Sequence, residues 1–290
     1  MMRSQLNLGQ IDYLNCWPLY HQLNGVPNGN HFTLRPGHPA QLNQELENGE
    51  IDISPSSSML LAVSPKSDYF VMPDIAIASL TEVRSVLLLS RRPLSELNGC
   101  SISLTSHSLT SIFLLKVILF HFQGLNPGKI TFTTEEFTPH QNREAALIIG
   151  DQALGIYHNP PPGFQIYDLG HLWHQFTGLP FVYALWIGRK PALKDKRPAL
   201  IDLHRNLTEI VARLPEKLAD LTEPALLKMG GNPTINPSQL LAYWCQAISY
   251  KLDNQALEGL ELFYRIAKNL GLINKVPELD FFPSPRYMDK

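Results

Sequence analysis

The hydrophobic pattern at the start of the chain alternates between short strands and a helix. Leu6, Leu8 and Ile11 are apolar among polar neighbours, which predicts a strand. The segment "HFTLRPG" predicts a second strand, and "HPAQLNQELENGE" predicts a helix that stops at Gly49. A third strand, "IDISPSSSM", is expected to end at Pro55. This alternation is typical of an α/β sheet with parallel neighbouring strands.

The middle of the chain continues the alternation with more apolar segments. Strands are predicted for Arg84–Ser90 and Leu179–Gly188, and also for "CSISLT", "KITFTT" and "AALIIGDQAL". The run "IFLLKVILFHF" predicts a buried helix. The predicted strands Arg84–Ser90 and Leu179–Gly188 lie at the two ends of this middle block. We therefore expect the chain to cross between two lobes at these strands.

The last third of the chain is helical in pattern. Periodic apolar residues in "LIDLHRNLTEIVARL", "NPSQLLAYWCQAISYKL" and "NQALEGLELFYRIAKNLG" predict three helices. We therefore predict a discontinuous α/β lobe of residues 1–88 and 184–290, which carries these helices, and an inserted α/β lobe of residues 89–183. A ligand is expected in the cleft between the two lobes.

Composition narrows the class of protein. The 290 residues are enough for two hydrophobic cores, and the net charge of -2 comes without any Lys/Arg run, so we expect no nucleic-acid partner. The cysteines Cys16, Cys100 and Cys245 lie far apart and form no C-x-x-C pair, which indicates reduced thiols. The longest apolar run, Ile112–Phe122, is too short to cross a membrane. The first residues contain no apolar signal region, so we expect a cytoplasmic protein that does not bind a membrane.

The stretch "TSHSLTS", residues 105–111, places five hydroxyl side chains immediately before the buried helix. The loop is expected at the carboxyl end of a strand, where ligands bind in open α/β sheets. The first turn of a helix has unpaired backbone N–H groups and a partial positive charge, which suit a carboxylate or a phosphate. A single serine that caps the helix is the simpler explanation. We favour anion binding, because one cap needs one hydroxyl.

A second hydroxyl cluster and an asparagine add to this picture. "SPSSS", Ser54 to Ser58, also follows a predicted strand and precedes an apolar segment. Two such turns would hold a ligand with two acidic ends, although helix capping explains this cluster equally well. Asn15 is expected to cap the helix that starts near Pro18 and is also a candidate to bind a substrate hydroxyl.

The other chemical signals are weaker. His171 and His174 have no third ligand at metal-binding spacing, so we predict no metal site. Asp151 is expected at the end of a strand, as a general base or as a turn residue. The motifs of serine hydrolases and of nucleotide-binding loops are absent from the sequence.

Six segments of the chain form a recognisable set: "IDYLNCWPLY", "PAQLNQELENGEIDISPSSS", "VRSVLLLSRRPLSELNG", "TSHSLTS", "LIIGDQAL" and "YDLGHLWHQFTGLPFVYALW". Together they resemble the chorismate dehydratase family of the futalosine route to menaquinone. The resemblance covers Ile11 to Lys190 and implies a two-lobed architecture like that of type II periplasmic binding proteins, with an interlobe cleft. It implies a lyase that removes water from chorismate, a small dianion, to give 3-[(1-carboxyvinyl)oxy]benzoate without a cofactor or a metal. We expect a monomer or a homodimer.

The same resemblance implies roles for particular residues. Asn15 would contact the reacting centre, and Asp151 would be the base unless the enolpyruvyl carboxylate of the substrate takes that role. The substrate-binding residues that it implies are Ser57, Ser58, Ser85, Thr105, Ser108, Thr110, Ser111 and Gly150.

The chain also departs from the family pattern. Leu60 and Leu61 stand where a Glu-Tyr pair is common, and His38 and His107 replace other residues.

Two alternatives stay open. One is 1,4-dihydroxy-6-naphthoate synthase of the same pathway, a related group that carries a His-Glu pair where this chain has Gly150-Asp151. The other is a non-catalytic cytosolic ligand-binding protein of the same fold. Turnover of chorismate would distinguish both from a dehydratase.

Overall fold

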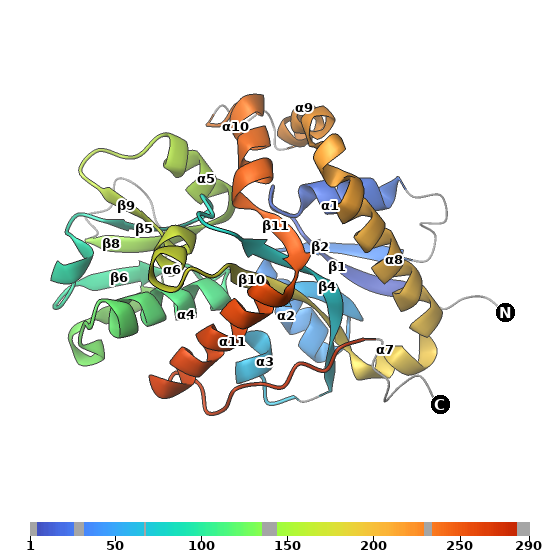
Figure 1. Cartoon of the computed structure of the whole chain (residues 1–290), viewed down its shortest axis with the longest axis horizontal. Coiled ribbons are helices and arrows are strands. Elements are labelled where there is room, and N and C mark those ends of the chain that lie inside the picture. Colours follow the sequence, from blue (N-terminus) through green and yellow to red (C-terminus); the bar gives the residue numbers. More distant parts are fainter. Residues whose placement is uncertain (1–4, 26–31, 67, 135–143, 229–233, 283–290) are drawn as a thin grey trace.

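Two β-sheets lie side by side in the computed structural model, which describes residues 5–25, 32–66, 68–134, 144–228 and 234–282 (Figure 1). Within these residues one sheet has six strands, in the order β11-β4-β10-β3-β1-β2, and the other has five, in the order β7-β6-β8-β5-β9. The strands of the first sheet are β1 (Leu6–Ile11), β2 (Phe32–Gly37), β3 (Ile53–Ser57), β4 (Tyr69–Ser79), β10 (Phe181–Arg189) and β11 (Ser249–Leu252). Those of the second are β5 (Val86–Ser90), β6 (Ser101–Leu104), β7 (Thr131–Thr134), β8 (Ala145–Ile149) and β9 (Gln165–Asp168).

Both sheets are mixed, which confirms the predicted α/β class but not a purely parallel arrangement. β1 is parallel to β2 and β3, and β6 is parallel to β7 and β8. By contrast, β10 is antiparallel to β3 and β4, and β5 is antiparallel to β8 and β9. The chain passes from the six-stranded sheet into the five-stranded sheet at β5 and returns to the six-stranded sheet at β10.

The two connections between the sheets are short. One joins the end of β4 at Ser79 to the start of β5 at Val86, and the other joins Thr177 to the start of β10 at Phe181. They precede the predicted lobe boundaries at residues 88/89 and 183/184 by a few residues. Those exact boundaries remain a prediction.

Helices cover both sheets and the junction between them. α2 packs on β1 and β3, α8 packs on β4 and α1, and α4 packs on β8 and β10. α11 contacts β10, β11 and α4, so it touches elements on both sides of the junction (Figure 1). The helices are α1 (Trp17–Asn24), α2 (Pro39–Asn48), α3 (Leu60–Val63), α4 (Leu109–Val117), α5 (Gly150–His158), α6 (Leu169–Thr177), α7 (Lys190–Asp195), α8 (Arg197–Arg213), α9 (Leu218–Lys228), α10 (Pro237–Ala242) and α11 (Asn254–Asn269).

Three predicted elements end differently in the structure. β3 continues through Pro55, which lies opposite Trp186 in an antiparallel pair, so the proline did not end the strand. The predicted strand "AALIIGDQAL" is β8 followed by α5, because Gly150 adopts a positive φ of 67° and turns the chain into a helix. The predicted helix "NPSQLLAYWCQAISYKL" is α10, a π-helical turn (η6, Tyr243–Ala247) and then β11.

An aromatic cluster closes the core at the junction of the sheets. Trp173 of α6 packs edge-on against Phe181 of β10 at 5.3 Å between ring centroids, and Phe263 of α11 contacts both rings. The Trp173 indole also donates a hydrogen bond to the carbonyl of Pro180. Gly259 permits this packing, since a Cβ at that position would lie 2.2 Å from the same carbonyl oxygen. Three elements are thereby fixed around the chain crossing.

The described helices are those of a protein without a membrane-spanning segment in this part of the chain. None of them combines the length and the apolar character that a bilayer crossing requires.

Candidate functional site

A small cavity lies between the two sheets, and we call it the central cavity. Its walls come from β1, β3, β4 and β10 of the first sheet, from β5 and β8 of the second, and from the starts of α2, α4 and α5. Its volume is about 60 Å³. The lining residues are Ile11, Tyr13, Asn15, Pro39, Ser57, Ile77, Val83, Ser85, Val86, Ser108, Ser111, Ile149, Gly150, Tyr183, Ala184 and Ile248. Six of the predicted site residues therefore meet here: Asn15, Ser57, Ser85, Ser108, Ser111 and Gly150.

The hydroxyl-rich loop before α4 contributes two of these side chains. Ser108 is the N-cap of α4: its hydroxyl accepts a hydrogen bond from the Ser111 N–H and donates one of 2.8 Å to the Ser111 hydroxyl. Thr105 lies outside the cavity lining, where its hydroxyl accepts the His107 N–H at 3.1 Å. The simple capping explanation thus holds for Ser108, which nevertheless still faces the cavity.

Thr110 joins the two sheets instead of lining the cavity. Its buried hydroxyl lies 2.5 Å from that of Ser57, the last residue of β3, and 3.2 Å from that of Ser58, which follows it. The Ser58 hydroxyl donates in turn to the carbonyl of Val182 in β10. This chain of hydroxyls connects the first turn of α4 to the six-stranded sheet, so Thr110 and Ser58 have their hydrogen bonds satisfied within the protein.

The second hydroxyl cluster differs from the expected helix start. Ser54, Ser56 and Ser57 lie within β3, and α3 after them is only four residues long with no side-chain cap at Met59. Of the two helix starts that were expected to bind anions, only that of α4 opens a helix of more than two turns.

Ser85 lies on the connection from β4 to β5 and is held from both sides. Its hydroxyl accepts a hydrogen bond of 2.8 Å from the Tyr243 hydroxyl and donates to the carbonyl of Val83 at 3.3 Å. Burial raises the pKa of Tyr243 far above its usual value, so this phenol is a neutral donor at every working pH.

Asn15 does not cap α1, contrary to the prediction. The N-cap is Cys16, which makes no side-chain capping bond. The Asn15 backbone carbonyl accepts the Tyr250 hydroxyl at 2.7 Å, and this bond fixes the backbone. Its side-chain Oδ1 is buried at the central cavity without a hydrogen-bond partner among the described residues. A buried oxygen without a donor is costly, so this amide is available to a ligand.

Asp151 is close to the cavity but does not line it. Its carboxylate accepts the N–H of Leu14 at 3.0 Å, a contact that joins the start of α5 to the segment before α1. Burial raises the pKa of Asp151 to about 6, and the negative charge of Asp12 adds to the rise, while the Leu14 hydrogen bond opposes it. A carboxyl group with this pKa can exchange protons near neutral pH.

Two tyrosines at the cavity were not predicted. The ring of Tyr13 lies against Gly150, where a Cβ would approach it to 3.2 Å, and burial followed by the charge of Asp151 raises its pKa to about 12. The Tyr183 hydroxyl is buried beside Gly170, which leaves room for it. Both tyrosines lie inside motifs that were recognised, but nothing in the sequence separates a cavity-lining tyrosine from a core one.

The described residues offer no metal site. No group of three or more His, Cys, Asp or Glu side chains is placed to hold an ion in this part of the chain. The lining of the central cavity also contains no Lys, Arg or His. A ligand there would be held by hydroxyls, one amide, backbone N–H groups and apolar walls.

Comparison with known proteins gives a consistent result along the sequence. A model of the family described as "Menaquinone biosynthesis" matches residues 6–269. A protein of Thermus thermophilus named chorismate dehydratase is 29% identical over 291 residues, which cover 91% of this chain and 95% of that protein. A protein of the same name from Campylobacter jejuni is 25% identical and covers 91% of this chain and 98% of its own length.

Solved structures agree on the fold. A protein of Archaeoglobus fulgidus superimposes with a TM-score of 0.72 at 15% identity and covers 94% of this chain and 100% of that chain. The alkanesulfonate-binding protein SsuA of Xanthomonas axonopodis pv. citri, bound to MOPS, has a TM-score of 0.71 at 15% identity and covers 96% of each chain. The predicted architecture, like that of periplasmic binding proteins, is thereby confirmed.

Proposed function

Because the chain belongs to the menaquinone biosynthesis family, whose model covers residues 6–269, we propose that it is a chorismate dehydratase. The observation that carries this proposal is the similarity to two proteins of that name along more than nine-tenths of the chain. The reaction removes water from chorismate and gives 3-[(1-carboxyvinyl)oxy]benzoate. A place in the futalosine route and in the cytoplasm is part of the same proposal and rests on the family resemblance.

The chemistry asks the protein for binding and proton transfer. Chorismate loses the proton on C3 and the hydroxyl on C4, and the ring becomes aromatic. Its two carboxylates need hydrogen-bond donors, and the hydroxyls that line the cavity are those of Ser57, Ser85, Ser108 and Ser111. The Ser85 and Ser108 hydroxyls donate within the protein, to Val83 and Ser111, and would exchange these acceptors for a bound carboxylate. Donors at the ring carboxylate also stabilise the charge that develops there as C3 is deprotonated.

Asn15 is the residue that we assign to the departing hydroxyl. Its Oδ1 has no partner within the described protein, and the side chain lines the central cavity. An amide can accept a hydrogen bond from the C4 hydroxyl and donate one as the C–O bond breaks. In this role it orients the leaving group and stabilises its negative charge.

Two candidates for the base remain, and the geometry supports one of them. Asp151 has a pKa of about 6, but its carboxylate accepts the Leu14 N–H and is not among the groups that line the cavity. The enolpyruvyl carboxylate of the substrate needs no protein group beside C3. We therefore assign proton removal to the substrate carboxylate and give Asp151 a positioning role through Leu14, next to Asn15.

The test is incubation of the purified chain with chorismate, followed by chromatography and mass spectrometry. The expected result is loss of one water and formation of 3-[(1-carboxyvinyl)oxy]benzoate without an added cofactor. Binding of chorismate without turnover would favour a ligand-binding protein. Absence of both would contradict the proposal and direct the assay to the substrate of the naphthoate synthase.

A further inference from the structure

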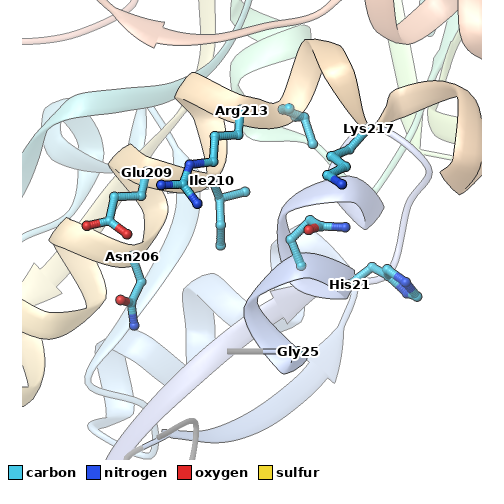
Figure 2. Close-up of a pocket in the computed structure, with 9 residues that line it drawn as sticks. His21, Gly25, Asn206, Glu209, Ile210, Arg213 and Lys217 are labelled. Atoms are coloured by element: carbon cyan, nitrogen blue, oxygen red, sulfur yellow. The ribbon is translucent and has the colours of Figure 1, made fainter. Parts of the chain in front are cut away.

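A second cavity lies between helices α1 and α8, apart from the central cavity. Its walls are the end of α1, the C-terminal half of α8 and the turn after it, η5 (Leu214–Glu216) with Lys217 (Figure 2). Its volume is about 410 Å³, against about 60 Å³ for the central cavity, and lies in the range of small-molecule sites. The lining residues are His21, Gln22, Gly25, Asn206, Glu209, Ile210, Arg213, Leu214 and Lys217.

Two cationic side chains, Arg213 and Lys217, and one carboxylate, Glu209, line this cavity. Arg213 extends from α8 on the side of Glu209, and Lys217, after the end of α8, extends toward α1; the His21 side chain leaves α1 on the side away from Arg213 (Figure 2). Neither the Arg213 nor the Lys217 side chain has a hydrogen bond or ion pair with any described residue. Arg205, two turns earlier on α8, is by contrast paired with Asp202 at 2.7 Å. Two cationic groups without partners that face one space can bind an oxyanion.

The remaining walls indicate what else the ligand carries. Glu209 supplies a carboxylate, and Asn206 and Gln22 supply amides, so hydroxyl groups would find both acceptors and donors. Ile210 and the buried Leu214 form an apolar part of the wall. A bare inorganic anion would use the cations alone and leave most of the volume empty.

We propose that this cavity is a second binding site, for a hydroxylated organic anion whose carboxylate or phosphate lies between Arg213 and Lys217. Glu209, Asn206 and Gln22 bind its hydroxyl groups, and Ile210 and Leu214 contact its carbon frame. The site lies at the far end of α1 from Asn15, about 12 Å along a helix of eight residues. It is independent of the dehydratase reaction proposed above.

The proposal is tested by calorimetry on the full chain at low ionic strength. Glucose 6-phosphate and quinate are the phosphate and carboxylate probes, with glucose as the neutral counterpart and inorganic phosphate as the anion without a frame. We expect at least one of the two organic anions to bind, and glucose not to bind. The Arg213→Gln and Lys217→Gln variants should each weaken that binding about tenfold or more, because a charge-assisted hydrogen bond is lost.

Controls separate this site from general charge effects and from the central cavity. Arg205→Gln removes a paired cation of the same helix and should leave the affinity unchanged. Ser108→Ala should also leave it unchanged, and the NMR signals of the His21 ring should shift only when the second cavity is occupied. The proposal is overturned if neither organic anion binds, or if Arg205→Gln weakens binding as much as Arg213→Gln. It is equally overturned if Arg213→Gln lowers only the stability of the helix end and leaves binding intact.

Discussion

At the scale of single residues, hydrogen bonds fix some of the groups that line the central cavity and leave others without a partner. Asn15 has a fixed backbone and an unpartnered amide oxygen. Ser85 has its hydroxyl fixed by Tyr243 and Val83. Gly150 combines a positive φ with close contact to the Tyr13 ring, so any other residue would strain the backbone and push that ring. The described lining is therefore largely fixed before a ligand binds, and the Asn15 Oδ1 and the Tyr183 hydroxyl are its buried polar atoms without a partner among the described residues.

Replacement of Asn15 by alanine should lower kcat for chorismate dehydration about a hundredfold and change KM much less. The reason is that, in the role proposed for it, the Asn15 amide would act on the leaving hydroxyl as the C–O bond breaks, more than on the bound substrate. Steady-state kinetics with both parameters measures this. Asn43→Ala is the matched control, since the Asn43 Oδ1 is also buried without a partner among the residues that the structure describes, but lies outside the cavity lining. A wild-type kcat in Asn15→Ala would remove this residue from the reaction.

At the scale of elements, one carboxylate organises the crossing between the sheets. Asp168 ends β9 and caps α6 by accepting the His171 N–H. The same carboxylate accepts the backbone N–H groups of Val83 and Arg84, on the connection that also carries Ser85. Arg84 has a positive φ of 59°, which is costly for a residue other than glycine. Asp168 thus holds a strained turn beside the central cavity.

We expect Asp168→Ala to lower the free energy of unfolding by about 2–4 kcal/mol, because a helix cap and two further N–H partners are lost together. Asp253→Ala is the control, since Asp253 caps α11 through a single hydrogen bond from the Ala256 N–H. This replacement should lower the free energy of unfolding by about 1 kcal/mol. Urea unfolding of both variants measures the difference. Equal losses would show that Asp168 acts only as a cap.

At the scale of the whole molecule, the two sheets are joined by polar contacts around a cavity that is too small for a typical ligand. Thr110 meets Ser57, Asp151 accepts the Leu14 N–H, and Arg84 donates to Gln246 at 2.8 Å. About 60 Å³ is well below the ~300 Å³ of small-molecule sites. The cavity in this structure is therefore smaller than the space that a typical small-molecule ligand fills.

Stability should depend on pH through Asp151. Its pKa is about 6 in the folded chain and 3.8 in the unfolded reference, so the folded state binds more protons between these values. The protonated Asp151 carboxyl therefore contributes to the stability of the folded state. This contribution is fully present below the unfolded pKa of 3.8 and is lost as pH rises through the folded pKa of about 6. Asp151→Asn keeps an acceptor for the Leu14 N–H and removes the charge. We expect the free energy of unfolding of this variant, relative to that of the wild type, to increase by about 1–3 kcal/mol as pH rises from about 4 to about 8.

Denaturant unfolding across this pH range measures the effect. Asp12→Asn should move the wild-type profile to lower pH, since the charge of Asp12 helps to raise the Asp151 pKa. Parallel profiles for wild type and Asp151→Asn would contradict a buried, titrating Asp151.

What the sequence determined by itself was local. The short strands β1 and β6 and the amphipathic helix α11 follow from periodicity. A serine cap before α4 was the simpler explanation of the hydroxyl cluster, and the structure places it at Ser108. The family resemblance came from the same short motifs. Two predictions that relied on a single residue type were wrong: Pro55 did not end β3, and Asn15 did not cap α1.

Only the tertiary structure decided which of these groups meet. Asp151 bonds to Leu14 across 137 positions of sequence, and Thr110 turns to Ser57 across 53, so neither appears in any local pattern. The cavity walls, the unpartnered oxygen of Asn15 and the raised pKa of Asp151 arise from how two sheets and their helices pack. The burial of a side chain and its hydrogen-bond partners are properties of the packed molecule. They depend on groups that the chain brings together only when both sheets have formed.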